Sequence, residues 1–451
     1  MDDQMKNVVK NVEKHRDLIF EAADFLWKHP ETGYKEWKSH AYLKEVYEKL
    51  GYTLTEAGDI PGFYTEIDTG RPGPTLLIMA ELDALCVASH PDCDPETKAV
   101  HACGHCCQSA GLVGVAAALK EPGALDGLCG KIRLMEVPAE EAIEIAFREE
   151  LRKKGVIRYF GGKQEFIARG MMDGVDLDTM VHSSSNAAHR FSATPGANGF
   201  LIKELTFKGK SAHAAGPFKG INALYAATQA LSAINAVRET MKDEDHIRIH
   251  PIITKGGTVV NAIPEEVTVE SYVRGASVGA IAEANDRVNR AAAGAALSLG
   301  ANVTICDRPG YLPRVNHTEM CEIAMDAANL VLGEGSATMG TKWGSGSSDM
   351  GDMSVLFPTA YLHINGATGT AHGADFDVSN TEALCVGAAK VQVAFARMLL
   401  ENGAARAKAV MASYEPLYKT KEEYCAALDA LMMDGDAITY RDGGTADVRW
   451  K

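Results

Sequence analysis

Two short apolar runs, each followed by helical patterns, constrain the fold of this chain most strongly. The runs 75-TLLIMA-80 and 131-KIRLMEV-137 have the length and apolar character of strands buried on both faces of a parallel sheet. Apolar residues recur at helical spacing over 110–120, 141–155 and 163–172. This alternation of strands and helices predicts an α/β architecture, a doubly wound sheet with helices on both faces.

The pattern changes after about residue 195, where apolar and polar residues begin to alternate. From there the sequence predicts the order strand, helix, strand pair, helix, strand, which is the split βαβ arrangement of a small ferredoxin-like α+β domain. The α/β pattern returns near 307-DRPGYLP-313. We therefore expect a larger domain at 1–194 and 309–451, with a smaller domain inserted at 195–308. The expected elements of the insertion are 198–213, 220–241, 247–253 with 266–273, 278–299 and 301–306.

The charge and composition of the chain argue against some classes of binding partner. The net charge is −15 and no basic stripe stands out, so we expect no nucleic-acid partner. No run reaches the 18 apolar residues of a membrane span, so no membrane partner is expected. The first twenty residues lack the apolar core and cleavage site of a secretory signal, which predicts a cytoplasmic protein. The ten cysteines are too sparse for a disulfide framework.

The segment 101-HACGHCC-107 concentrates potential metal ligands just before an apolar helix. Cys103 and His105 are separated by one residue, so on an extended segment both side chains would point to the same side. A thiolate and an imidazole are good ligands for zinc, and imidazole also suits manganese or cobalt. No second C-x2-C spacing follows, which argues against a closed zinc finger. Spacing alone favours the alternative that these are core thiols and a structural histidine.

Other potential ligands stand where predicted strands end. Glu140 and Glu141 follow the strand in 135-MEVPAEEA-142, Asp83 follows the strand at 75–80, and His182 closes 179-TMVH-182. His372 lies in the Gly-rich loop 366-GATGTAHGADFDV-378, the kind of segment that often carries sites. Each residue taken singly could be structural, and two glutamates suit a solvated helix start. Their recurrence at strand ends, where α/β sheets bind ligands, predicts an open metal site.

These motifs, in this order, resemble the aminoacylase/carboxypeptidase-type metallopeptidases. The resemblance covers nearly the whole chain. It is to the amidohydrolase branch that includes auxin-conjugate hydrolases, hippurate hydrolases, p-aminobenzoyl-glutamate hydrolases and Xaa-Arg dipeptidase. The motifs that carry it are 29-HPETGYKEWKSHAYLKEVYEKLGY-52, 79-MAELDAL-85, 101-HACGH-105, 138-PAEEA-142, 206-TFKGKSAHAAGP-217 and 345-SGSSDMGDMSVLFPT-359.

The resemblance implies a role for each matching position. It implies two divalent transition-metal ions, zinc or manganese with cobalt as a further option, in the larger, catalytic domain. The smaller domain would serve for dimerisation and as a lid, which implies a homodimer. The metal ligands would be Cys103, His105, Glu141, His182 and His372. Glu140 would be the general base, Asp83 a supporting carboxylate, and His213 an oxyanion-stabilising residue reaching the partner's site, while Asn261 and Arg274 would contact the substrate.

The chain also departs from the branch pattern. Cys106 stands where Asp or Asn is usual, and Gln108 where many members have histidine, which puts metal choice and the support of the ligands in question. The charged stretch 142–166 replaces glycines; we expect a surface helix there rather than a reshaped substrate mouth. The implied activity is hydrolysis of an N-acyl amino acid, an aminobenzoyl-glutamate-like conjugate or a dipeptide. The alternative is a pseudo-enzyme that binds a metal or ligand without catalysis.

Overall fold

The computed structural model describes residues 3–186 and 188–451, which form two compact units. The larger unit contains Met1–Gly196, Arg314–Gly344 and Asp352–Lys421. The smaller unit contains Ala197–Pro313, Ser345–Gly351 and Glu422–Lys451. The segment Glu422–Lys451, expected from the sequence to lie in the larger domain, instead belongs to the smaller unit. Its strand β18 (Met433–Asp436) forms an edge of that unit's sheet by pairing with β14 (Asn302–Pro309).

An eight-stranded mixed sheet forms the centre of the larger unit. Its four middle strands are parallel and lie in the order β6 (Lys131–Val137), β3 (Thr75–Glu81), β7 (Leu177–Ser184) and β17 (Thr359–Asn365). Every residue of β3 is buried, as expected for a parallel strand covered on both faces. The flanking strands are β2 (Phe63–Asp68) and β1 (Thr55–Glu56) beside β6, and β8 (Phe191–Ala193) and β16 (Ala337–Met339) beside β17.

Helix α4 (His105–Lys120) is the central helix of the larger unit. All its residues except Lys120 are buried, because Ala, Gly, Leu and Val cover every face of the helix. It packs against β3 and β7 and against α1 (Asp3–Lys14), α2 (Arg16–Lys28) and α11 (Ala388–Leu400). The remaining elements are α3 (Trp37–Lys49), β4 (Leu85–Cys86), β5 (Ala99–Val100), α5 (Ile145–Lys153), α6 (Gly162–Ala168), α9 (Thr318–Leu332), the π-helical η3 (Glu382–Gly387), η4 (Asn402–Ala404) and α12 (Ala405–Ser413).

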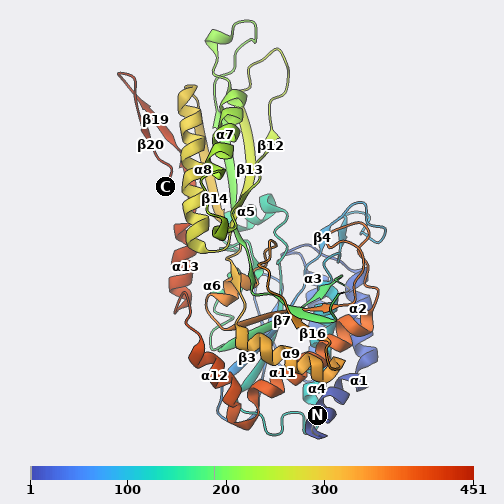
Figure 1. Cartoon of the computed structure of the whole chain (residues 1–451). Coiled ribbons are helices and arrows are strands. Elements are labelled where there is room, and N and C mark those ends of the chain that lie inside the picture. Colours follow the sequence, from blue (N-terminus) through green and yellow to red (C-terminus); the bar gives the residue numbers. More distant parts are fainter. Residues whose placement is uncertain (1–2, 187) are drawn as a thin grey trace. The chain divides into compact units, whose positions relative to one another are not determined.

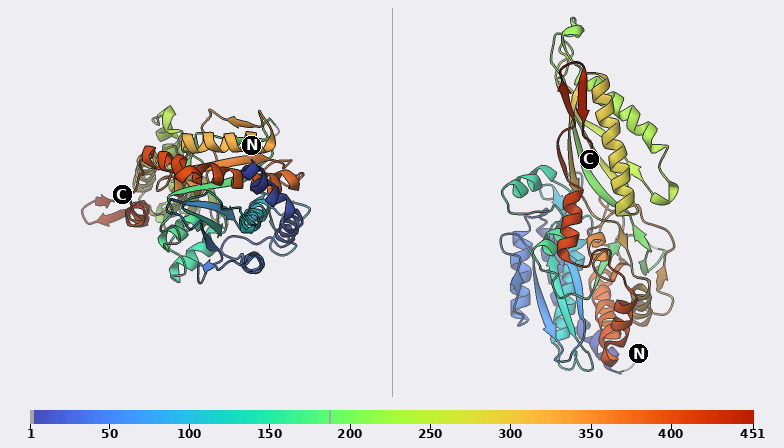
Figure 2. Two further views of the ribbon diagram at one scale, coloured as in Figure 1. Left: turned by 90° about the horizontal axis from the view of Figure 1, so that it is seen from below. Right: turned by 90° about the vertical axis from the view of Figure 1, so that its left-hand side faces the viewer.

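The smaller unit is an antiparallel sheet packed against two helices (Figures 1 and 2). Strand β13 (Glu266–Gly275) lies beside β10 (Gly199–Lys208), which pairs in turn with β14. Helices α7 (Ala223–Arg238) and α8 (Val278–Ser298) pack on each other and on these strands. The unit also contains η1 (Pro217–Lys219), η2 (Asp243–Asp245), β11 (Arg248–Ile249), β12 (Ile252–Lys255), β19 (Ile438–Arg441) and β20 (Thr445–Val448). Four elements lie at or near the points in the sequence where the chain passes from one unit to the other: β9 (Gly196–Ala197), β15 (Arg314–Val315), α10 (Met350–Ser354) and α13 (Lys421–Ala430).

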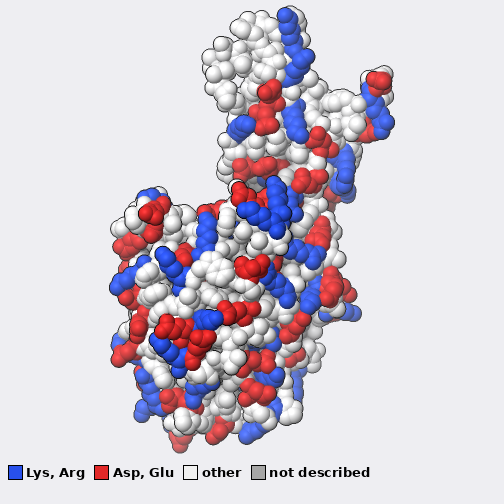
Figure 3. Space-filling model, turned by 180° about the vertical axis from the view of Figure 1, so that it is seen from behind, with Lys and Arg blue, Asp and Glu red and all other residues white. Residues whose placement is uncertain are grey.

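These elements confirm the predicted fold, an α/β sheet domain with an inserted small α+β domain. One stretch of the described chain, Glu382–Leu400, is long and apolar enough to cross a membrane. Its most apolar window is 83% buried in the structure, so it is better explained as a core helix. On the face drawn in Figure 3, acidic and basic side chains are interspersed over most of the surface.

Candidate metal centre

The predicted ligands come from neighbouring strand ends of the larger unit. Asp83, the pair Glu140 and Glu141, and the loop that carries His372 follow the carboxyl ends of β3, β6 and β17, while His182 lies near the end of β7. Since these four strands are neighbours in the sheet, their ends converge at one edge. The sheet order therefore explains why residues so distant in sequence meet.

The segment that carries Cys103 and His105 differs from the expected extended conformation. Residues 102 and 103 form a turn, Gly104 has a left-handed φ of 82°, and His105 is the first residue of α4. A Cβ atom at position 104 would collide with the side chain of Ser183, so glycine is required by both conformation and space. The two ligands are thus brought together by a tight turn into a helix rather than by strand periodicity.

Three groups of ligand atoms occur here, each with all its atoms within 4.8 Å of one another. Cys103 is shared by two of them. The Sγ atom of Cys103 lies 3.4 Å from Nε2 of His182, and Nε2 of His372 lies 3.2 Å from Oε1 of Glu141. Overlapping groups that share one thiol suit two neighbouring cations. The groups are Cys103 with His105 and His182, Cys103 with Glu141 and His372, and Glu81 with His105 and Glu140.

Asp83 orients two of these residues. Nδ1 of His105 lies 2.9 Å from the carbonyl oxygen of Asp83 and 3.3 Å from its Oδ1 atom, so this nitrogen carries the proton. The lone pair of Nε2 is then available to a metal. The other carboxylate oxygen of Asp83 accepts from the backbone N–H of Glu141 at 2.7 Å.

The donor atoms fit a divalent cation. Nε2 of His105 and Oε1 of Glu141 are buried and make no hydrogen bond of normal geometry to the described residues, although Glu81 and His372 each bring an atom to within 3.2 Å of them. Burial, and then the charge of Glu141, raise the pKa of the Cys103 thiol, so a nearby cation is needed to favour the thiolate. Burial lowers the pKa of His182, which keeps that imidazole neutral as a ligand must be. Nitrogen, oxygen and sulfur donors together suit zinc or a similar transition metal.

Glu81 was missed by the sequence analysis, although it stands two residues before Asp83 at the end of β3. Its Oε2 atom lies 3.2 Å from Nε2 of His105, and it accepts from Nε2 of Gln108 at 2.9 Å. The buried ammonium of Lys163 lies 2.6 Å from its other oxygen. Burial opposes ionisation, but Lys163 and His105 together lower the pKa of Glu81 below its ordinary value. Glu81 and Asp83 are two positions apart, so on a strand their side chains point to the same side. This spacing was the signal that could have revealed Glu81.

The turn that bears Glu140 is held by two buried side chains, those of Glu36 and Arg148. Ala139 has a positive φ of 59°, an uncommon conformation for a residue with a side chain. Its N–H donates to Glu36 at 2.8 Å. The fully buried Arg148 donates to the carbonyl oxygens of Ala139 at 3.3 Å and Phe160 at 2.7 Å, and to that of Glu141. Helix α5 is a surface helix, as expected, and its one buried residue, Arg148, anchors the carboxylate pair.

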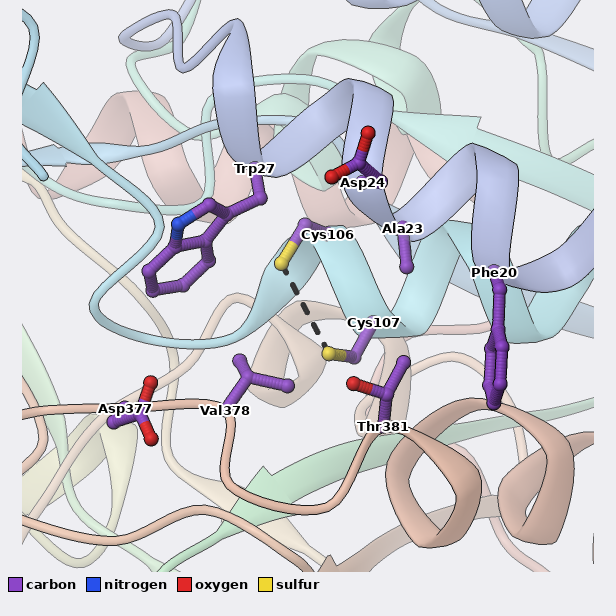
Figure 4. A pocket seen from close by; sticks show the side chains of 9 residues that line it. All are labelled: Phe20, Ala23, Asp24, Trp27, Cys106, Cys107, Asp377, Val378 and Thr381. Atoms are coloured by element: carbon purple, nitrogen blue, oxygen red, sulfur yellow. Dashed lines mark hydrogen bonds between the residues drawn. The ribbon is translucent and has the colours of Figure 1, made fainter.

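Cys106 and Cys107 belong to none of the three ligand groups. They line a cavity of about 350 Å³ with residues of α2 and of the segment 377–381, as Figure 4 shows. Their sulfur atoms lie 3.9 Å apart. The departure at Cys106 therefore places a thiol beside a cavity, while the departure at Gln108 places an amide on Glu81.

The three remaining predicted residues belong to the smaller unit. The backbones of His213 and Ala262 form a bridge, and the N–H of Ala214 donates to the carbonyl of Asn261 at 3.0 Å. Nδ1 of the exposed His213 accepts from Ala215 at 3.0 Å, so the neutral ring carries its proton on Nε2. Arg274, on β13, donates to Oγ of Ser347 at 3.0 Å.

Comparison with known proteins relates this chain to characterised hydrolases. The sequence profile of peptidase family M20/M25/M40 matches residues 77–397. Thermostable carboxypeptidase 1 of Saccharolobus solfataricus is 27% identical over 72% of this chain and 79% of its own length. One of the polypeptides of p-aminobenzoyl-glutamate hydrolase from Escherichia coli is 28% identical over 65% of this chain and 58% of its own length. A solved Bacillus subtilis structure, described as a dinuclear metal-binding peptidase of the M20 family, superposes with a TM-score of 0.66 at 21% identity, over 86% of this chain and 99% of that one.

Proposed function

Because the chain belongs to peptidase family M20/M25/M40, we propose that it is a two-metal amidohydrolase acting on an N-acyl amino acid, an aminobenzoyl-glutamate-like conjugate or a dipeptide. The family membership expected from the motifs is confirmed, and so is the class of enzyme, a hydrolase of amide and peptide bonds. The relatives favour this function over that of a non-catalytic metal-binding or ligand-binding protein.

One observation carries the proposal: two ligand groups share Cys103 at the converging strand ends. Cys103, His105 and His182 would hold one ion, and Cys103, Glu141 and His372 the second. Zinc and manganese both suit these donors, and cobalt is a further option. The donor set therefore supports a dinuclear centre, as in the Bacillus subtilis structure.

The proposed chemistry assigns a distinct task to each side chain. When bound, a divalent ion lowers the pKa of water from about 15.7 to roughly 7 and polarises the carbonyl. Glu140, which is 8% exposed, takes the proton from the attacking water and returns it to the leaving amine. Asp83 fixes the tautomer of His105 and the position of Glu141. The leaving group departs as a neutral amine because Glu140 supplies this proton.

The smaller unit supplies the other proposed residues. His213, with its proton on Nε2, would stabilise the oxyanion in the partner subunit of a homodimer, a contribution of roughly 3 kcal/mol for such a donor. Asn261 and Arg274 would contact the substrate.

Elemental analysis of the purified protein tests the proposal. We expect about two equivalents of transition metal per chain, lost from Cys103→Ser and retained in Cys107→Ser, a matched change of a buried cysteine outside the ligand groups. The loaded enzyme should then hydrolyse members of a panel of N-acyl amino acids and dipeptides. Wild-type protein that takes up no metal from zinc, manganese or cobalt solutions would contradict the proposal.

A further inference from the structure

Three cysteine side chains of the larger unit lie close together outside the candidate metal centre. The Sγ atoms of Cys106 and Cys107 are 3.9 Å apart, and the thiol of Cys107 also forms a hydrogen bond with that of Cys385. Each of these residues is at most 2% exposed, and none belongs to the three groups of potential metal ligands. The proposed hydrolase function therefore gives no task to this thiol cluster of Cys106, Cys107 and Cys385.

Two packed elements build the thiol cluster. Cys106 and Cys107 lie in the first turn of α4, and Cys385 lies in the π-helical segment η3, which packs on α4. A Cβ atom at Gly111 would lie 3.3 Å from the carbonyl oxygen of Cys385, so glycine permits this close approach. π-Helical turns are rare and are frequently found at functional sites. The packing of η3 on α4 thus holds the third thiol against Cys107.

A cavity gives access to two of the three thiols. Cys106 and Cys107 line a space of about 350 Å³, and the carboxylates of Asp24 and Asp377 lie around the same space (Figure 4). Asp24 also pairs with Lys28 at 2.8 Å, but no lysine or arginine is among the described residues that line the cavity. A metal site inside a protein needs such a path of entry. Because negative charge raises the local concentration of cations, the two carboxylates favour entry of a positively charged ion.

The thiol cluster is reduced in the structure, where all ten cysteines of the chain are free. Consecutive Cα atoms are about 3.8 Å apart, whereas the Cα atoms of a disulfide are usually about 4.4–6.8 Å apart. Cys106 and Cys107 are therefore poorly placed to form a disulfide with each other. Their thiols stay available as metal ligands.

The type and number of the ligand atoms favour one class of metal. Thiolates are soft ligands, which select Cu(I) and zinc. Structural zinc needs four ligands, and no histidine, aspartate or glutamate of the described chain forms a ligand group with these thiols. Cu(I) accepts fewer ligands, so two or three thiolates suffice. With metal–sulfur bonds of about 2.3 Å, as for zinc, one ion can bridge sulfur atoms up to about 4.6 Å apart, which includes the Cys106–Cys107 pair.

We propose that the thiol cluster binds one Cu(I) ion at a site separate from the dinuclear centre. Cys107 is the central ligand because it contacts both other thiols, and Cys106 and Cys385 complete the site. Each ligating thiol releases its proton to solvent. Copper enters and stays as Cu(I), so no electron is transferred. The sequence departure at Cys106 thereby supplies one of the soft ligands.

Transfer of copper from the coloured Cu(I)–bicinchoninate complex, under anaerobic conditions, tests this proposal. Zinc-loaded wild type should withdraw about one equivalent of Cu(I) per chain, and Cys107→Ser none. Cys106→Ser should bind Cu(I) at least about tenfold more weakly, because changes to groups that merely support a metal ligand already cost about that much. Cys425→Ser, which alters a buried cysteine of the smaller unit, should behave as the wild type.

A second comparison separates the copper site from the proposed hydrolase centre. Cys103→Ser removes the thiol shared by two ligand groups, so it should lose zinc but still take up as much Cu(I) as the wild type. Cys107→Ser should show the opposite, with zinc retained and Cu(I) lost. Loss of Cu(I) from Cys103→Ser as well would place the copper in the dinuclear centre and overturn the proposal. A wild type that binds Cu(I) but no zinc would contradict only the hydrolase proposal.

X-ray absorption at the copper edge needs no variant, so it does not depend on how well Cys107→Ser folds. The Cu(I)-loaded wild type should show sulfur neighbours only. Nitrogen neighbours would indicate the histidines of the dinuclear centre, and Cu(I) left entirely with bicinchoninate would mean that the thiol cluster binds no copper. Either result would overturn the proposal.

Discussion

The Nζ atom of Lys163 lies 2.6 Å from Oε1 of Glu81, and both side chains are fully buried. The other oxygen of Glu81 lies 3.2 Å from Nε2 of His105. Lys163 thus stabilises a carboxylate that burial alone would protonate, directly beside a proposed metal ligand. The ion pair therefore stabilises the folded end of β3 and also keeps the carboxylate of Glu81 charged beside the candidate metal centre.

Lys163→Met should therefore destabilise the protein strongly. Removing one member of a buried ion pair costs about 3–5 kcal/mol, because the remaining charge is left uncompensated. Urea denaturation should show this loss, and the double variant Lys163→Met/Glu81→Gln should recover most of it. Additive losses in the double variant would mean that the pair does not interact as the distances indicate.

Glu140→Gln should separate catalysis from metal binding. The amide cannot accept the proton of the attacking water, so kcat should fall by at least about 100-fold. Metal content and thermal stability should stay close to the wild type, because Glu141 supplies the carboxylate proposed as ligand. Hydrolysis at a rate near that of the wild type would remove Glu140 from the role of general base.

The sequence predicts those parts of the site that follow from strand ends. Asp83, Glu140 and His182 stand at or just beyond apolar strands, and parallel strands bring such positions together. It does not predict the conformation of Cys103 and His105, because a single left-handed glycine replaces the expected strand periodicity.

Ion-pair and hydrogen-bond partners that come from distant segments of the chain also cannot be predicted from the local sequence pattern. Lys163 reaches Glu81 across 82 residues of sequence, and Arg148 sits in a stretch whose charges suggested a surface helix. Burial of these cations depends on the tertiary packing around them, which local periodicity does not encode. The C-terminal segment was assigned to the larger domain for the same reason, since the pairing of its strand β18 with β14 joins segments that are distant in the sequence.

Glu136 predicts a measurable dependence of stability on pH. Burial raises its pKa to about 7. The hydroxyl of Ser109 lies 2.7 Å from Oε2 of Glu136 and 3.1 Å from the carbonyl of Glu81, but it has one proton to donate. A protonated Glu136 can donate to Ser109, which then donates to Glu81, so the protonated acid satisfies both contacts.

The sign of this effect follows from the two pKa values. A carboxyl with a pKa of about 4.3 when unfolded and about 7 when folded contributes stability below the first value, and this is lost as pH rises through the second. Relative to Glu136→Gln, the wild type should lose about 3 kcal/mol of unfolding free energy between pH 4 and pH 8. Urea titrations at both pH values check this, with the exposed Glu48→Gln as control. A pH-independent difference between wild type and Glu136→Gln would contradict it.

Arg148→Met should impair catalysis without abolishing substrate binding. The loss of donors to Ala139, Phe160 and Glu141 frees a turn whose residue Ala139 has a strained positive φ, so Glu140 and Glu141 should shift. A displacement of about 1 Å at a catalytic group can cost about 100-fold in rate. We expect kcat to fall by about 10- to 100-fold with KM within threefold, and metal affinity to weaken through Glu141.

Arg148→Lys should recover little, because one ammonium cannot replace a planar fork on three carbonyls. Arg152→Met, one turn further along the same helix and paired with Glu149, should leave kcat unchanged. An equal fall in kcat for Arg152→Met would mean that the effect comes from changes in helix α5 as a whole and not from the hydrogen bonds between Arg148 and the turn.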